Sequence, residues 1–130
     1  MNEAEQKIID TVNRLGDEMI DFAMRLVAEP STLGNEAGVI TVMTNELNRL
    51  GFSTSLVPLE NEALKNHPGF APVPWSLEGR YNVVGILSPG GDGGRSALFN
   101  GHLDVVNTGK VDGWTHDPFF PVVIDNWLYG

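Results

Sequence analysis

The sequence predicts an α/β fold in which two amphipathic helices pack on a sheet of buried strands. Apolar residues recur at helical spacing near the N-terminus, and two dense apolar runs occupy residues 82–87 and 96–100. Of the 130 residues, 42% are hydrophobic and 19% are charged, which is typical of a single globular domain. We therefore expect a layered α/β domain with a mixed sheet, whose ligands gather beyond the carboxyl ends of the strands.

Two helices account for the first part of the chain. Between residues 4 and 29, apolar side chains recur every three or four positions, which predicts one long helix that ends before Pro30. A second helix is expected to begin after Asn35, a good N-cap, and to end at Gly51. The residues predicted to face the core are Ile8, Val12, Leu15, Met19, Leu26, Ile40, Met43, Leu47 and Leu50.

The remaining elements are strands and loops. Residues 52–59 predict a strand that Pro58 ends or keeps at an edge, and residues 60–80 carry too much proline and glycine for a long helix. Residues 82–87 and 96–100 predict adjacent buried strands, joined by a glycine-rich turn at 89–94. Residues 122–129 predict a further strand or hairpin.

Composition excludes several classes of partner and site. The formal net charge of −9 would repel nucleic acid, and the absence of cysteine excludes thiolate metal sites and disulfides. No apolar run approaches the roughly 20 residues of a membrane helix, and the first residues are acidic where a secretory signal would be basic. We expect a cytoplasmic protein that binds neither membrane nor nucleic acid.

His102 and Asp104 are the strongest candidate site residues. They follow an apolar run and Gly101, and side chains two apart in extended backbone point to the same side. A neutral imidazole can offer one nitrogen to a metal while the other donates to a carboxylate, which fixes the ring. The alternative is that the two residues pair only to satisfy their own hydrogen bonds.

Other polar and aromatic residues fit structural roles better. His67 and His116 lie in segments that predict a loop and a polar turn, so we do not assign them as ligands. Trp114 and Phe119 more often anchor a loop to the core than touch a substrate. Ser31 has no nearby histidine in sequence and no strand-turn-helix elbow, which argues against a nucleophile.

The residues around His102 carry a resemblance to a known family. Asn-Gly-His-Leu-Asp-Val-Val at 100–106 is followed by Trp114, by Asp-Pro-Phe at 117–119 and by Leu-Tyr-Gly at 128–130. Pro30-Ser31 with Glu36, and the run Gly-Arg-Tyr-Asn-Val-Val at 79–84, agree with it. The chain resembles the zinc-dependent amidohydrolase family of acetylornithine deacetylase, succinyl-diaminopimelate desuccinylase, aminoacylase and carboxypeptidase G.

The resemblance implies a layered α/β/α, zinc-exopeptidase-like catalytic domain of which residues 1–130 form the N-terminal part. It implies that His102 binds one of two zinc ions, with Co²⁺ as a possible substitute, and that Asp104 supports that histidine in the catalytic site. The substrate class it implies is an N-acyl amino acid or small peptide, cleaved at an amide bond.

The resemblance also implies residues that this chain does not contain. No glutamate follows Glu78. The family's general base, its further ligands and its inserted domain for dimerisation and closure have no counterpart, so we expect a truncated chain that binds zinc weakly and is inactive alone. Open alternatives are a non-catalytic acidic module that acts in self-association or partner binding, and a hydrolase completed by another chain. Uncovered strand edges further predict a homo-oligomer.

Overall fold

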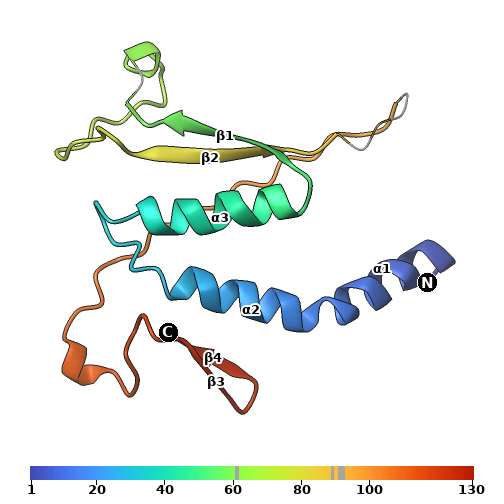
Figure 1. Cartoon of the computed structure of the whole chain (residues 1–130). Coiled ribbons are helices and arrows are strands. Elements are labelled where there is room, and N and C mark those ends of the chain that lie inside the picture. Colours follow the sequence, from blue (N-terminus) through green and yellow to red (C-terminus); the bar gives the residue numbers. More distant parts are fainter. Residues whose placement is uncertain (61, 89, 91–92) are drawn as a thin grey trace. The chain divides into compact units, whose positions relative to one another are not determined.

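The computed structural model describes residues 1–60, 62–88, 90 and 93–130, and these form three α-helices and two antiparallel two-stranded sheets (Figure 1). The predicted α/β class is confirmed. The chain divides into two compact units, one of Met1–Glu29 with Thr108–Gly130 and one of Pro30–Asn107. In the part of the chain described, no helix combines the length and apolar character needed to cross a bilayer.

The first unit begins with two helices where the sequence predicted one. Helix α1 spans Glu3–Arg14 and α2 spans Gly16–Val27. The prediction of a single helix over residues 4–29 is wrong because Leu15, with φ −88° and ψ 1°, leaves the helical conformation between them. Gly16 follows directly, and glycine destabilises a helix interior by about 1 kcal/mol relative to alanine, so a break here costs little.

A hairpin ends the first unit. Strand β3 (Val122–Ile124) pairs with β4 (Trp127–Tyr129), as residues 122–129 predicted. Asp125 and Asn126 form the turn with φ values of 51° and 64°, the left-handed conformation that a two-residue type I′ turn requires at both positions. Asparagine and aspartate tolerate that conformation better than other residues with a side chain, which is why this turn closes here.

The second unit is a helix packed on a strand pair. Helix α3 (Ala37–Arg49) lies against β1 (Ser53–Pro58) and β2 (Tyr81–Ile86), as Figure 1 shows. A side chain at Gly85 would lie 3.1 Å from Leu47, so this glycine permits the close approach of helix and strand.

The ends of α3 match the prediction on one side only. Gly51 follows the helix with φ 86°, as predicted for its C-terminal end. The predicted Asn35 cap is wrong, because Glu36 occupies the cap position and makes no side-chain cap bond. The Asn35 amide instead donates to Thr32 Oγ1 at 3.0 Å, within the loop that precedes the helix.

The strand pair is antiparallel and ends at a proline. Ser53 lies opposite Ile86 and Pro58 opposite Tyr81, so the predicted strand over 52–59 and the one over 82–87 are confirmed with small shifts. The long connection between them contains a short 3₁₀ turn, Glu62–Leu64.

The predicted strand at residues 96–100 is wrong, since the structure assigns no strand to them. Leu98 and Phe99 are 91% and 93% exposed, the opposite of a buried strand. A strand needs a ladder partner, and residues 96–100 pair with no strand among the described residues; β2 pairs with β1 alone. The glycine-rich turn predicted at 89–94 falls partly outside the described residues, which omit 89, 91 and 92.

The apolar core is small. Among the residues that the structure describes, Val39 is buried at 2% exposure, and the only other buried apolar residue is Pro118 in the first unit. Many large apolar side chains are instead exposed, and Leu98, Phe99 and Val106 are the extreme cases in the second unit. Apolar surface on this scale is typical of faces that bind another protein segment.

Candidate functional site

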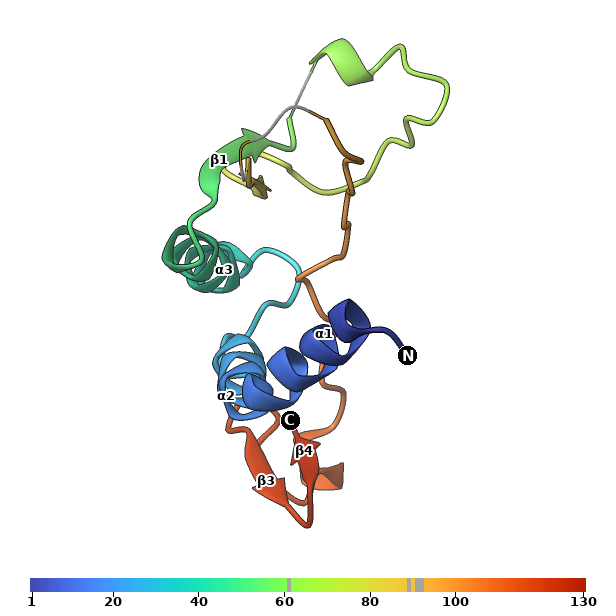
Figure 2. The same ribbon diagram turned by 90° about the vertical axis from the view of Figure 1, so that its right-hand side faces the viewer.

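The predicted site residues lie on a segment that is tied to the loop before α3. Figure 2 shows residues 100–107, in orange, meeting this loop, in pale blue. The Ser31 hydroxyl donates to the Leu103 carbonyl at 2.8 Å, and the Val105 amide donates to the Ser31 carbonyl at 3.0 Å. Ser31 itself is 2% exposed. These two bonds join residues about 70 positions apart in the chain and hold the backbone on both sides of Asp104.

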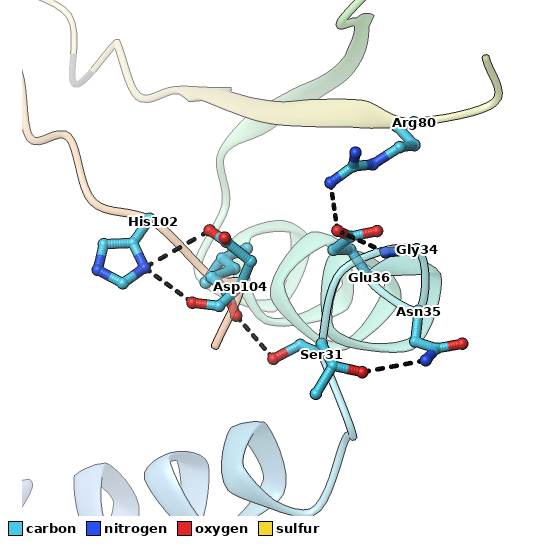
Figure 3. Close-up of polar contacts among 9 residues, drawn as sticks. Ser31, Gly34, Asn35, Glu36, Arg80, His102 and Asp104 are labelled. Atoms are coloured by element: carbon cyan, nitrogen blue, oxygen red, sulfur yellow. Dashed lines mark hydrogen bonds and ion pairs between the residues drawn. The ribbon is translucent and has the colours of Figure 1, made fainter. Parts of the chain in front are cut away.

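His102 and Asp104 lie together, as their spacing predicted. The His102 Nδ1 atom is 2.8 Å from the Asp104 backbone carbonyl and 3.5 Å from its carboxylate oxygen Oδ1 (Figure 3). The shorter contact is therefore made by the backbone, whereas the sequence suggested the carboxylate as the orienting group. A proton on Nδ1 satisfies this contact and leaves the lone pair on Nε2 available to a metal ion.

The imidazole is open to solvent and is not packed in hydrocarbon. The side chain of His102 is 84% exposed and that of Asp104 is 60% exposed. An exposed imidazole can reach a ligand or a further protein segment, which burial among apolar side chains would prevent. The pair keeps the accessibility that a metal-binding role demands.

A second polar pair lies at the start of α3. The guanidinium of Arg80 contacts the Glu36 carboxylate through Nη2, and the Gly34 amide donates to the same carboxylate at 3.1 Å (Figure 3). Both side chains are mostly buried, at 17% and 15% exposure. The Arg80 Nε atom is buried without a hydrogen-bond partner among the described residues.

Burial and hydrogen bonding act in opposite directions on Glu36. Burial raises the pKa of this carboxyl, but hydrogen bonds from the backbone amides of Glu36 and Gly34 and the bond and charge of Arg80 outweigh it. The net effect lowers the pKa below its ordinary value of 4.5. Glu36 is therefore held as a carboxylate, and it fixes the loop that carries Ser31.

Both pairs line one open hollow of about 400 Å³ within the second unit. Its polar wall combines a guanidinium, two carboxylates and an imidazole, and its other walls come from β2, α3 and the long connection between the strands. The lining residues are Glu36, Ile40, Leu59, Trp75, Leu77, Arg80, Tyr81, Asn82, Val83, Asn100, Gly101, His102, Leu103 and Asp104.

The donor types at this hollow fit zinc, but the pair supplies only part of a site. An imidazole nitrogen and a carboxylate oxygen are both common zinc ligands. A catalytic zinc ion takes about three protein ligands, and the described residues contain no group of three or more histidines or carboxylates placed to share a metal. At this hollow, His102 and Asp104 beside it are the residues that could hold an ion.

The other residues singled out in the sequence lie in structural settings. His67 Nδ1 accepts from the Gly69 amide at 3.0 Å in an exposed loop. His116 stacks edge-on with Tyr129, with 6.0 Å between ring centroids. Trp114 donates through its indole nitrogen to Thr108, and Phe119 is half-buried. None of these contacts gives a reason to assign a ligand.

Ser31 and Arg80 are the site residues that sequence reasoning missed. The bonds of Ser31 join segments far apart in sequence, so no local pattern could reveal them. The sequence held one indication of these residues. The family resemblance included Pro30-Ser31 with Glu36 and Gly79-Arg80, but it gave them no role.

Comparison with known proteins agrees with the family resemblance seen in the sequence. Succinyl-diaminopimelate desuccinylase of Methylorubrum extorquens is 32% identical over 109 residues, which cover 84% of this chain. By sequence, the chain is similar to the succinyl-diaminopimelate desuccinylases. The desuccinylases of Dechloromonas aromatica and Ehrlichia chaffeensis are each 28% identical, over 116 and 109 residues. The predicted resemblance to this amidohydrolase family is confirmed.

The match to the desuccinylases is partial on their side. The chain spans about a quarter of the length of these relatives, 24% for the Methylorubrum protein and 25% for the Dechloromonas protein. No family profile matches the chain, and no solved structure gives a significant match.

Proposed function

We propose that this desuccinylase relative forms the N-terminal part of the catalytic domain of a metal-dependent amide hydrolase. The proposed reaction is cleavage of an amide bond in an N-acyl amino acid or small peptide. The observation that carries the proposal is the exposed His102–Asp104 pair beside the hollow, whose contact at Nδ1 leaves Nε2 available to a ligand.

In this proposal His102 is a metal ligand and Asp104 orients it. Zinc is the proposed ion, with two in the complete site, and Co²⁺ is a possible substitute. A bound zinc ion supplies Lewis-acid chemistry and acidifies a water molecule. The chain's own contribution is to hold the His102 ring with its proton on Nδ1, because the Asp104 carbonyl accepts there.

We further propose that the 130-residue polypeptide by itself binds metal weakly and does not hydrolyse acyl amino acids. One imidazole and one neighbouring carboxylate fall short of the ligands that zinc catalysis uses, and hydrolysis also needs a base to accept a proton from water. Chelator-sensitive hydrolysis of an N-succinyl amino acid by the purified polypeptide would contradict this part of the proposal. The cytoplasmic location expected from the sequence remains a prediction.

Paramagnetic Co²⁺ tests the metal site directly. Added to isotope-labelled protein, it should broaden the amide signals of residues 100–105 before those of the other segments. His102→Ala should abolish this preference, and His67→Ala, which removes an exposed loop histidine, should preserve it. Equal broadening in the wild-type protein and in His102→Ala would overturn the assignment of His102.

The alternative function is a non-catalytic acidic module that acts by self-association or partner binding. The exposure of Leu98 and Phe99 on an extended segment favours it, since such a segment can pair with a second copy. A partner chain that completes the hydrolase site is the third possibility, and the mass of the native particle separates it from a homo-oligomer.

A further inference from the structure

We infer that Ser31 is a positioning residue that sets the orientation and the tautomer of His102 by holding the backbone of Asp104. The inference rests on the proposed function only in giving His102 a ligand to bind. The bonds from which it is drawn are present without any metal.

The first step is the pattern of the two bonds. The Ser31 carbonyl accepts from the Val105 amide, and the Ser31 hydroxyl donates to the Leu103 carbonyl. In a parallel β-bridge, one residue bonds the carbonyl before its partner and the amide after it through its own backbone. Here the partner is Asp104, and the hydroxyl of Ser31 takes the place of the backbone amide as donor.

The second step leads from Asp104 to the imidazole. Both bonds flank Asp104, so they fix the peptide groups on either side of it. The Asp104 carbonyl is the group that His102 Nδ1 contacts at 2.8 Å. Because the His102 side chain is 84% exposed, packing contributes little to its orientation. The carbonyl contact, which is shorter than the 3.5 Å contact of Nδ1 with the Asp104 carboxylate, therefore has the larger part in deciding which nitrogen carries the proton.

The third step is the burial of Ser31. At 2% exposure, its hydroxyl cannot exchange the Leu103 carbonyl for water. Removing the hydroxyl leaves that carbonyl without its donor in a nearly dry position, which favours a shift of residues 103–105. If Ser31 only filled space, loss of its hydroxyl would not change the orientation of His102.

The test measures the His102 tautomer in metal-free protein from the imidazole nitrogen shifts in NMR spectra. Wild-type protein should show the proton mainly on Nδ1, and Ser31→Ala should move the population toward the Nε2-protonated form. Ser31→Cys, which keeps the volume but donates weakly, should lie between the two. Thr32→Ala is the matched control, because it removes the neighbouring loop bond from Asn35 and leaves the Ser31 bonds in place.

A second readout is metal affinity, which should fall about 10-fold in Ser31→Ala if His102 is the ligand. An unchanged tautomer in Ser31→Ala, with binding still abolished by His102→Ala, overturns the inference and leaves the proposed function intact. A shifted tautomer with no metal binding by the wild-type protein supports the inference and removes the proposed function. If circular dichroism shows that Ser31→Ala is unfolded, Ser31→Cys decides the question by the same criteria.

Discussion

The chain behaves in opposite ways on the two sides of His102. On the C-terminal side, Leu103 and Val105 are bonded to Ser31, and polar groups are buried with partners. On the N-terminal side, residues 96–100 form no strand, and Leu98 and Phe99 are more than nine-tenths exposed. A polar side chain, Ser31, is thus buried on one side of His102, and apolar side chains are exposed on the other side, where a core strand was expected.

The difference shows what each kind of segment needs. A buried polar group needs one or two correctly placed partners, and Ser31 supplies both for its neighbour segment. An apolar strand needs a neighbouring strand along its whole length and a covered face. Among the described residues, Ser31 has its polar partners, but residues 96–100 have no neighbouring strand. The side of the site that is held by tertiary contacts is therefore the side with the polar contacts to Ser31.

The largest expected effect on stability comes from removing the mostly buried ion pair of Arg80 with Glu36. Arg80→Met should lower the free energy of unfolding of the second unit by about 2–3 kcal/mol, because it leaves the mostly buried Glu36 carboxylate without its cation. Urea unfolding followed by circular dichroism, with a stabilising osmolyte in both samples, measures the loss.

Lys65→Met is the control for Arg80→Met, since it removes a cation from the exposed pair with Glu62. Exposed pairs contribute little because solvent screens them and their side chains lose entropy on pairing. Equal losses of stability in the two variants would show that burial of the Arg80–Glu36 pair has no special weight.

A smaller effect should appear on acidification. The pKa of Glu36 is lowered in the folded protein, so its contribution to stability is complete above its ordinary value of 4.5 and is lost as the pH falls through the lower folded value. Glu36→Gln, which cannot ionise, should therefore lose less stability than the wild-type protein between pH 6 and pH 3. Parallel stability curves for Glu36→Gln and the wild-type protein would contradict the lowered pKa.

The sequence predicted the local features of the fold better than the long-range ones. The hairpin at 122–129, the glycine that ends α3 and the segments that form β1 and β2 follow from turn residues and apolar patterns close in sequence. The pairing of β1 with β2 was not predicted, because the sequence indicated residues 96–100 as the neighbour of 82–87. Residues 96–100 have the composition of a core strand, but whether they form one depends on a partner that no local pattern reveals.

The site divides in the same way. His102 and Asp104 could be found because they are two residues apart after an apolar run. The hydrogen bonds that attach this segment to Ser31 could not be predicted, because they join segments that are distant in sequence. The contact of His102 with the Asp104 backbone carbonyl could not be predicted either, because every residue has a backbone carbonyl. The break at Leu15 was missed because the apolar spacing continues across it, and only Gly16 hinted at a helix end.

The smallest effect on stability should come from the exposed side, where Phe99→Ser tests whether the apolar run associates. Its ring is 93% exposed, so the substitution should change the free energy of unfolding by no more than about 0.5 kcal/mol. If residues 96–100 pair with a second copy, Phe99→Ser should nevertheless shift the chain toward monomer in sedimentation velocity.

Phe120→Ser, the same change at a residue that is 71% exposed in the other unit, is the control and should leave association as in the wild-type protein. Equal association in both variants would mean that exposed apolar surface in general, and not the apolar segment beside His102, brings copies together.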